Sequence, residues 1–204
     1  MKRLIIWFLI LASISFRANA QVFESTSEAF TRCYSYEKEG KYDEAAVELK
    51  KVYDEHSYEI NLRLGWLYYK TGSYIESMDH YKKAIILKPY AAEPRFGYIY
   101  PASEAGNWSQ VEEQYRQILA VDPMNTVANY WLGMIFYNRE EFETALKYFE
   151  KVVNLYPFDY DSTIMFAWTN FKMGNLREAK LLFQQALLIS PGDESATEGL
   201  ALIQ

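Results

Sequence analysis

The sequence predicts an all-α protein in which helical hairpins stack one after another. Three observations predict this fold. A pattern of small, aromatic and proline residues recurs about every 34 residues, the apolar residues of each copy follow helical spacing, and glycine and proline punctuate the copies at fixed positions. Periods of this length are typical of solenoids, because one hairpin cannot bury its apolar face without stacking on a neighbour.

The clearest copy lies over residues 58–91. Leu64, Gly65 and Tyr68 share one face of a predicted first helix, and Gly72 breaks the chain after it. Four apolar or aromatic residues share one face of the predicted second helix: Tyr74, Met78, Tyr81 and Ile85. Pro89 ends that helix, because proline has no N–H and disfavours the helical region for the residue before it. Two helices joined by a tight turn form an αα-hairpin.

Further copies fill the same positions. In the second helix these hold a small or apolar residue, a bulky residue, another small or apolar residue and a closing proline. The sets are Ser77, Tyr81, Ala84 and Pro89; Val111, Tyr115, Ile118 and Pro123; Ala145, Phe149, Val152 and Pro157; Ala179, Phe183, Ala186 and Pro191; and, in a first copy with Ser57 in place of proline, Ala45, Leu49 and Val52. In the first helix, Leu132-Gly133-Phe136 repeats Leu64-Gly65-Tyr68.

This pattern resembles the tetratricopeptide repeat (TPR) family over about residues 26–193. The resemblance implies a right-handed α-solenoid of about five helix-turn-helix hairpins and a protein-binding role without catalysis, but it says almost nothing about the particular partner. The repeat spacing places the hairpins at residues 26–57, 58–91, 92–125, 126–159 and 160–193, after a short linker at 21–25 and before a capping helix at 194–204.

Residues 1–20 predict a secretory signal peptide. Lys2 and Arg3 precede an apolar run over residues 4–16, and Ala18-Asn19-Ala20 supplies the small residues of a cleavage site before Gln21. The alternative is a membrane anchor, but a run of 13 residues is short against the roughly 20 that span a bilayer. We therefore expect a periplasmic or secreted protein with no membrane span after cleavage.

Three positions depart from the repeat pattern. Pro101 falls well inside the first helix of repeat 92–125, where proline costs roughly 3 kcal/mol or more, which predicts a kinked or broken helix. Glu140 takes the turn position that holds glycine in the other copies, so a non-glycine residue must accept that geometry. Cys33, the sole cysteine, occupies the small-residue position of Gly65, which predicts a buried thiol. An exposed thiol that pairs between chains is the alternative.

A second face of the first helices carries the candidate site. Positions 5, 9 and 12 of each repeat project from the side opposite the Leu-Gly-Tyr face, and ten of these fifteen residues are aromatic against 17% of the chain. They are Phe30, Tyr34, Trp66, Tyr69, Phe96, Tyr100, Tyr130, Tyr137, Trp168 and Phe171. Large aromatic surfaces are typical of binding sites, so we expect them to line a concave, partner-binding groove. The alternative is that the rings only pack between neighbouring repeats.

Charge and motifs exclude several classes of function. Without Lys2, Arg3 and Arg17, 18 basic residues remain against 27 acidic ones, a net charge of −9, whereas nucleic acids and anionic membranes require a basic surface. His56 and His80 have no metal-ligand constellation around them and are predicted to be surface residues. No phosphate-binding loop or nucleophile motif is present. The sequence therefore predicts a non-enzymatic protein with no cofactor.

Three functions fit these observations. The first is a protein-interaction scaffold of the periplasm or cell envelope that binds a protein or peptide segment in the aromatic groove. The second is a carbohydrate-binding module linked to polysaccharide export, in which the rings would stack on an oligosaccharide. The third is a structural solenoid that associates with itself through an exposed end or through Cys33.

Overall fold

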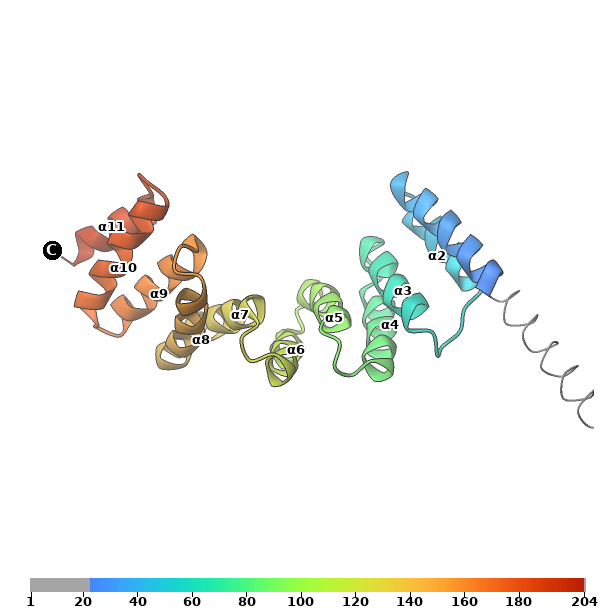
Figure 1. Cartoon of the computed structure of the whole chain (residues 1–204), viewed down its shortest axis with the longest axis horizontal. Coiled ribbons are helices and arrows are strands. Elements are labelled where there is room, and N and C mark those ends of the chain that lie inside the picture. Colours follow the sequence, from blue (N-terminus) through green and yellow to red (C-terminus); the bar gives the residue numbers. More distant parts are fainter. Residues whose placement is uncertain (1–22, 204) are drawn as a thin grey trace, which may run out of the picture. The chain divides into compact units, whose positions relative to one another are not determined.

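The structure, a computed structural model, describes residues 23–203, and every element in that range is helical (Figure 1). A helix over residues 23–38 is followed by α2 (Tyr42–Lys50), α3 (Tyr58–Lys70), α4 (Tyr74–Leu87), α5 (Glu93–Glu104), α6 (Trp108–Val121), α7 (Thr126–Asn138), α8 (Phe142–Leu155), α9 (Tyr160–Lys172), α10 (Leu176–Ile189) and α11 (Glu194–Leu202). The predicted signal peptide lies outside the described residues. Residues 23–25, predicted as part of a linker, belong to the first helix instead.

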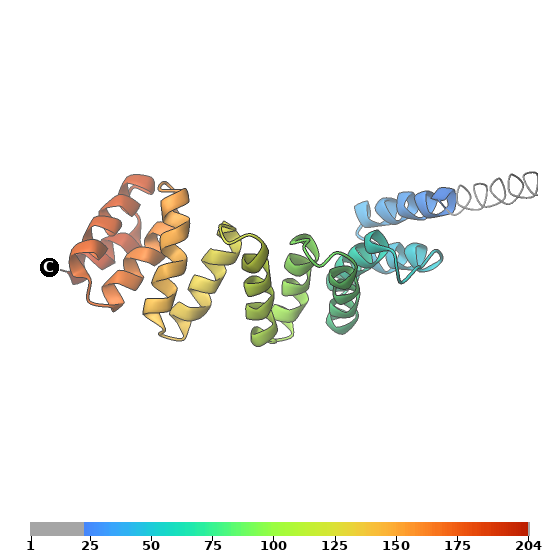
Figure 2. The ribbon, with the colours of Figure 1, turned by 60° about the horizontal axis from the view of Figure 1, so that its bottom comes forward.

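The chain divides into two compact units, of which the structure describes residues 23–107 and 108–203. The division falls between α5 and α6, inside the predicted repeat 92–125. Each unit is a stack of antiparallel helices in which every helix packs against the next one along the chain (Figure 2). Each unit therefore has the helical-hairpin architecture that the repeat pattern predicts.

Local signals explain where the helices of unit 1 begin and end. The Ser57 side chain accepts a hydrogen bond from the Ile60 backbone N–H and so caps α3. Gly72, at φ 77°, ends the same hairpin arm in a left-handed conformation that glycine adopts without steric cost. The α4 helix then returns along α3, and the buried Ser77 hydroxyl donates a 2.6 Å hydrogen bond to the Gly65 carbonyl.

The core of unit 1 depends on close approach at glycines. The Tyr81 ring of α4 lies 2.9 Å from the position that a Cβ on Gly65 of α3 would take. The same ring lies 2.2 Å from the corresponding position on Gly97 of α5. The ring is therefore held between two helices that can approach it only because both carry glycine. Because α3 and α5 also contact each other, this ring fixes the spacing of three helices.

Of the kink or break predicted at Pro101, the break is wrong. The α5 helix runs from Glu93 to Glu104 with Pro101 inside it and buried. Proline removes the hydrogen bond to the carbonyl four residues earlier, and its ring crowds that carbonyl. The hydrogen bonds after it are made, with the Ala105 N–H bonded to Pro101 O and the Asn107 N–H bonded to Ala102 O. Burial of the segment against its neighbours compensates for the one missing bond.

Unit 2 stacks α6 to α11 in the same way. Asn125, Asp159 and Asp193 cap α7, α9 and α11, each by accepting a hydrogen bond from a backbone N–H three residues later. Glu140 adopts φ 61° in the turn before α8, which confirms that a non-glycine residue takes the left-handed geometry there. The α11 helix packs against α10 and α9, as the predicted capping helix should.

Candidate functional site

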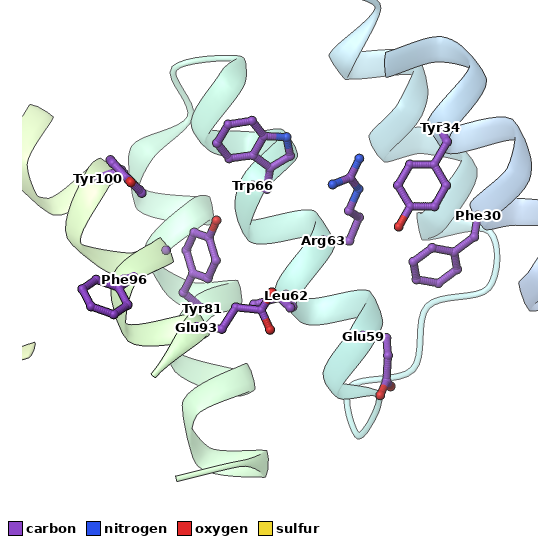
Figure 3. A pocket seen from close by; sticks show the side chains of 11 residues that line it. Phe30, Tyr34, Glu59, Leu62, Arg63, Trp66, Tyr81, Glu93, Phe96 and Tyr100 are labelled. Carbon is purple, nitrogen blue, oxygen red and sulfur yellow. The ribbon is translucent and has the colours of Figure 1, made fainter. Parts of the chain in front are cut away.

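An open cleft of about 770 Å³ lies in unit 1 between the first helix, α3 and α5 (Figure 3). It is lined by Phe30, Tyr34, Glu59, Leu62, Arg63, Trp66, Tyr81, Glu93, Phe96, Gly97 and Tyr100. We call it the unit 1 cleft. Five of the six aromatic residues predicted for this part of the chain line it, and the sixth, Tyr69, packs behind the lining with its ring centroid 5.8 Å from that of Trp66 and 5.6 Å from that of Tyr100.

Helical spacing brings these side chains to one cleft. Phe30 and Tyr34 are four residues apart and so lie one turn apart on the same face of the first helix. The α3 helix presents a longer stripe, with Glu59, Leu62, Arg63 and Trp66. The α5 helix presents Glu93, Phe96, Gly97 and Tyr100 over two turns. The Tyr81 ring of α4 forms the floor between α3 and α5, as Figure 3 shows.

Glu37 holds the α3 wall of the cleft in place. Its carboxylate accepts a 2.9 Å hydrogen bond from Trp66 Nε1 and forms an ion pair with Arg63. The Arg63 guanidinium in turn lies 4.4 Å from the centroid of the Tyr34 ring. One carboxylate of the first helix therefore orients two side chains of α3, and the guanidinium packs back onto the first helix. These contacts hold the Trp66 indole in place at the cleft.

Two further carboxylates face the cleft from the helix N-termini. Glu93 accepts a 3.2 Å hydrogen bond from the Tyr58 hydroxyl, and burial together with the Glu93 charge raises the pKa of Tyr58 to about 12. Glu59 lies 3.5 Å from Lys88 in a pair whose side chains are both more than half exposed. Exposed pairs of this kind contribute little stability and exchange readily with solvent or with a ligand.

The four predicted site residues of unit 2 do not form one such cleft. Tyr130 lines a smaller hollow of about 460 Å³ together with Thr126, Val127, Trp131, Val152, Tyr156, Asp159, Asp161 and Ser162. Tyr137 packs edge-on against Phe142, with 5.4 Å between the ring centroids. Burial raises the pKa of Tyr137.

Trp168 and Phe171 pack against the unit 2 core, at the end of the chain that α11 covers. Trp168 packs edge-on against Phe183 at 4.9 Å, and its Nε1 donates a 2.8 Å hydrogen bond to the Ser195 hydroxyl of α11. This arrangement is what the packing alternative describes. The sequence alone could not separate the two kinds of aromatic position, because both occupy the same places in the repeat.

The structure corrects the prediction that both histidines are surface residues. His56 is exposed, whereas His80 is stacked on Tyr68 at 5.4 Å and meets Tyr53 edge-on at 5.7 Å. Its Nδ1 lies 3.0 Å from Asn61 Oδ1, and burial lowers its pKa to about 4. The neighbours of His80 in sequence alternate in polarity. The groups that bury it come from elsewhere in the chain: Tyr53 from the loop between α2 and α3, and Asn61 and Tyr68 from α3.

No group of three or more His, Cys, Asp or Glu side chains that could hold a metal ion occurs among the described residues. Cys33 is fully buried in the unit 1 core, as predicted, and burial raises the pKa of its thiol. Among residues 23–203, no helix has both the length and the apolar character needed to cross a bilayer.

Sequence reasoning missed several members of the unit 1 cleft. Gly97 and Glu59 were not assigned to the groove, whereas the sequence places Glu93 among the charged residues at its rim. A signal for the two carboxylates exists, because Glu59, Glu93 and Asp161 share one position of the repeat. The structure also places Arg63 in the lining.

Comparison with known proteins identifies the repeats. Family models described as tetratricopeptide repeat match residues 31–92, 102–160 and 161–193. The chain is 27% identical over 155 residues to human Protein O-mannosyl-transferase TMTC1, which covers 73% of this chain and 17% of that protein. It is 25% identical over 108 residues to the RNA polymerase-associated protein CTR9 of Caenorhabditis elegans, which covers 52% of this chain and 9% of that protein. The chain thus spans less than a fifth of the length of either relative.

Solved structures share the fold. A tetratricopeptide repeat protein from Parabacteroides merdae superposes with a TM-score of 0.74 at 19% identity, over 88% of this chain and 72% of that one. MamA from Desulfovibrio magneticus superposes with a TM-score of 0.69 at 16% identity, over 83% of this chain and 97% of that one. At these identities the likeness establishes the architecture alone.

Proposed function

Because this chain belongs to the tetratricopeptide repeat family, a family of protein-interaction scaffolds, we propose that it binds a segment of another protein in the unit 1 cleft without catalysing a reaction. One observation carries the proposal. Six aromatic side chains from four helices line a single open cleft.

The volume of the cleft and the exposure of its rings suit this role. A volume of about 770 Å³ is comparable to the roughly 300–1,000 Å³ of small-molecule sites, which is room for a few side chains of a bound segment. Tyr34 and Tyr100 are 45% and 54% exposed, so both offer ring surface to a partner. Because Glu37 already fixes Trp66, binding would cost less side-chain entropy than ordering a free ring.

The mannosyl-transferase relative does not alter this proposal. The match covers 17% of that protein, so its named activity has no necessary connection with the part that resembles this chain. A scaffold requires no catalytic group, and the cleft offers aromatic contact area with carboxylates at its edge. A protein of this kind acts by the affinity and selectivity with which it binds its partner.

We propose, from the residues at 1–20, that the chain is exported to the periplasm or the cell envelope. The basic start, the apolar run and Ala18-Asn19-Ala20 support this proposal. Mass spectrometry of the intact protein from its native cells tests it. A mature chain that begins at Gln21 supports export with cleavage, and a protein that retains residues 1–20 contradicts it.

The binding proposal is tested with two tyrosine variants in unit 1. Tyr100 lines the cleft, whereas Tyr90 is 81% exposed and lies outside the lining. Tagged wild-type protein, Tyr100→Ala and Tyr90→Ala are each used to purify partners from native extract. We expect Tyr100→Ala to lose a protein that Tyr90→Ala retains, with all three showing the same melting temperature. Retention of the same proteins by both variants contradicts the proposal.

A titration separates the carbohydrate alternative. Trp66 lies in the cleft, so an occupant that touches it changes its fluorescence. Oligosaccharides that shift the emission of the wild type but not of Trp66→Phe would favour a sugar-binding cleft. A shift produced only by the purified protein partner would favour the scaffold.

A further inference from the structure

We propose that the segment bound in the unit 1 cleft carries a lysine or arginine side chain that lies against Glu93 and, about 10.5 Å further along the cleft, an apolar residue that lies on Tyr100. The inference rests on the proposed function and adds the chemistry of the partner. It is carried by the charges that face the cleft, by the spacing of side chains along α5, and by cation contacts that the same rings already make.

The charges that face the cleft are mainly negative. The one cation in the lining is Arg63, and Glu37 already neutralises it in an ion pair. Glu93 accepts its hydrogen bond from the neutral Tyr58 hydroxyl, a contact that leaves the carboxylate charge in place. Glu59 adds a second carboxylate, whose contact with Lys88 is exposed and weak. A cationic side chain is the complement of this lining, and an acidic one is repelled by it.

The α5 helix sets the spacing of the two contacts. Glu93 and Tyr100 are seven residues apart on one face of the helix and both line the cleft, with Phe96 between them. Seven residues of α-helix extend about 10.5 Å. A partner segment meets this spacing with residues seven apart on a helix, or with residues three apart in a polyproline-type conformation, whose rise is about 3.1 Å per residue.

Aromatic rings at the cleft already hold cations of this chain. The Arg63 guanidinium lies 4.4 Å from the Tyr34 ring centroid, and Lys70 Nζ lies 5.4 Å from that of Trp66. Rings attract cations through their negative faces, and more strongly where water is partly excluded. Tyr100 is more than half exposed, so its ring is available to the apolar residue of the segment, while the cation lies against Glu93.

The same chemistry recurs in unit 2. Asp161 occupies in repeat 160–193 the position that Glu93 occupies in repeat 92–125. It lines the smaller hollow with Tyr130 and Trp131, so a carboxylate again stands beside aromatic rings. The same repeat position therefore places an acid beside aromatic rings in both units.

A peptide-display selection tests the inference without knowledge of the natural partner. A library of random twelve-residue peptides is panned on the full exported chain, and peptides that also bind Tyr100→Ala are removed. We expect the remaining peptides to be enriched in lysine or arginine three or seven residues from an apolar residue. Enrichment of neutral or acidic peptides overturns the cationic inference and leaves the proposed function standing. A selection that yields no peptide dependent on Tyr100 overturns both.

A matched pair of charge variants then tests the role of Glu93. Affinity for a selected lysine peptide is measured for wild type, Glu93→Gln and Glu76→Gln; Glu76 is exposed on the first turn of α4 and lies outside the cleft lining. We expect Glu93→Gln to weaken binding about fivefold, the factor that corresponds to a partly exposed ion pair, and Glu76→Gln to have no effect. Equal affinities for all three proteins overturn the assignment of Glu93.

Discussion

The Tyr81 ring occupies the space into which a side chain at Gly97 would extend. A Cβ on Gly97 would lie 2.2 Å from Tyr81 Cε1, closer than non-bonded carbon atoms approach, and a Cβ on Gly65 would lie 2.9 Å from Tyr81 Cγ. The ring is held between α3 and α5 and cannot move away from either. This contact sets the distance between the two helices that carry Trp66 and Tyr100, and so the width of the unit 1 cleft.

We expect Gly97→Ala to destabilise the protein by about 1–3 kcal/mol, because an added methyl group overpacks a rigid site. Urea unfolding followed by circular dichroism measures the change. Combining Gly97→Ala with Tyr81→Leu should cost less than the sum of the single changes, since the smaller side chain makes room for the methyl group. Strict additivity of the two free-energy changes would show that the ring and the glycine do not compete for space.

Glu140 predicts a stabilising substitution. It adopts φ 61°, whereas Gly72 occupies the equivalent turn position at φ 77°. Glu140→Gly should raise the free energy of unfolding by a few tenths to about 1 kcal/mol, because relief of the left-handed conformation exceeds the added freedom of the unfolded chain. The reciprocal control, Gly72→Ala, should lower it by about 1 kcal/mol. A stability loss in Glu140→Gly would contradict the assignment of strain to this turn.

His80 predicts a dependence of stability on pH. Burial between Tyr68 and Tyr53 lowers its pKa to about 4, below the ordinary value of 6.5 that it regains on unfolding. The unfolded chain therefore binds the proton more readily, and stability should fall as the pH drops from about 6.5 towards 4. His80→Gln should remove this part of the pH dependence in unfolding curves, whereas His56→Gln, at an exposed position, should retain it.

Glu37 predicts a coupled effect on stability and on the cleft. Glu37→Gln leaves the largely buried Arg63 without its counter-charge, at a cost of about 1–3 kcal/mol. The coupling energy in a double-mutant cycle with Arg63→Gln should be favourable and similar in size. Time-resolved fluorescence anisotropy of Trp66, measured in a background where the other tryptophans are replaced by phenylalanine, should show greater ring mobility in Glu37→Gln. Unchanged mobility would assign Glu37 to stability alone.

We expect the Cys33 thiol to be unreactive in the folded protein. Because it is fully buried and its pKa is raised, it should react with a thiol reagent only as fast as the protein unfolds. Dimers linked through this residue should be absent under oxidising conditions. Rapid labelling of the native protein, or a disulfide-linked dimer, would restore the alternative of self-association through Cys33.

The sequence by itself determined the helices, their order and their repeat. These properties depend on signals that lie within each copy: helical spacing of apolar residues, caps such as Ser57, and a glycine or, at Glu140, a strained residue in the turn. It also identified the aromatic positions, five of which line the unit 1 cleft. It misjudged Pro101, because the cost of a lost hydrogen bond is set by how well the surrounding helices bury the segment.

Only the tertiary structure decided which aromatic positions face a cleft. Trp66 and Trp168 occupy the same position of their repeats, yet Trp66 is held by Glu37 of the preceding repeat in an open cleft, and Trp168 is held by Ser195 of α11 against the core. The residue that corresponds to Glu37 before Trp168 is Tyr137, which has no carboxylate to offer. The repeat pattern determines the helix position from which a side chain projects, and residues of other repeats determine what that side chain contacts.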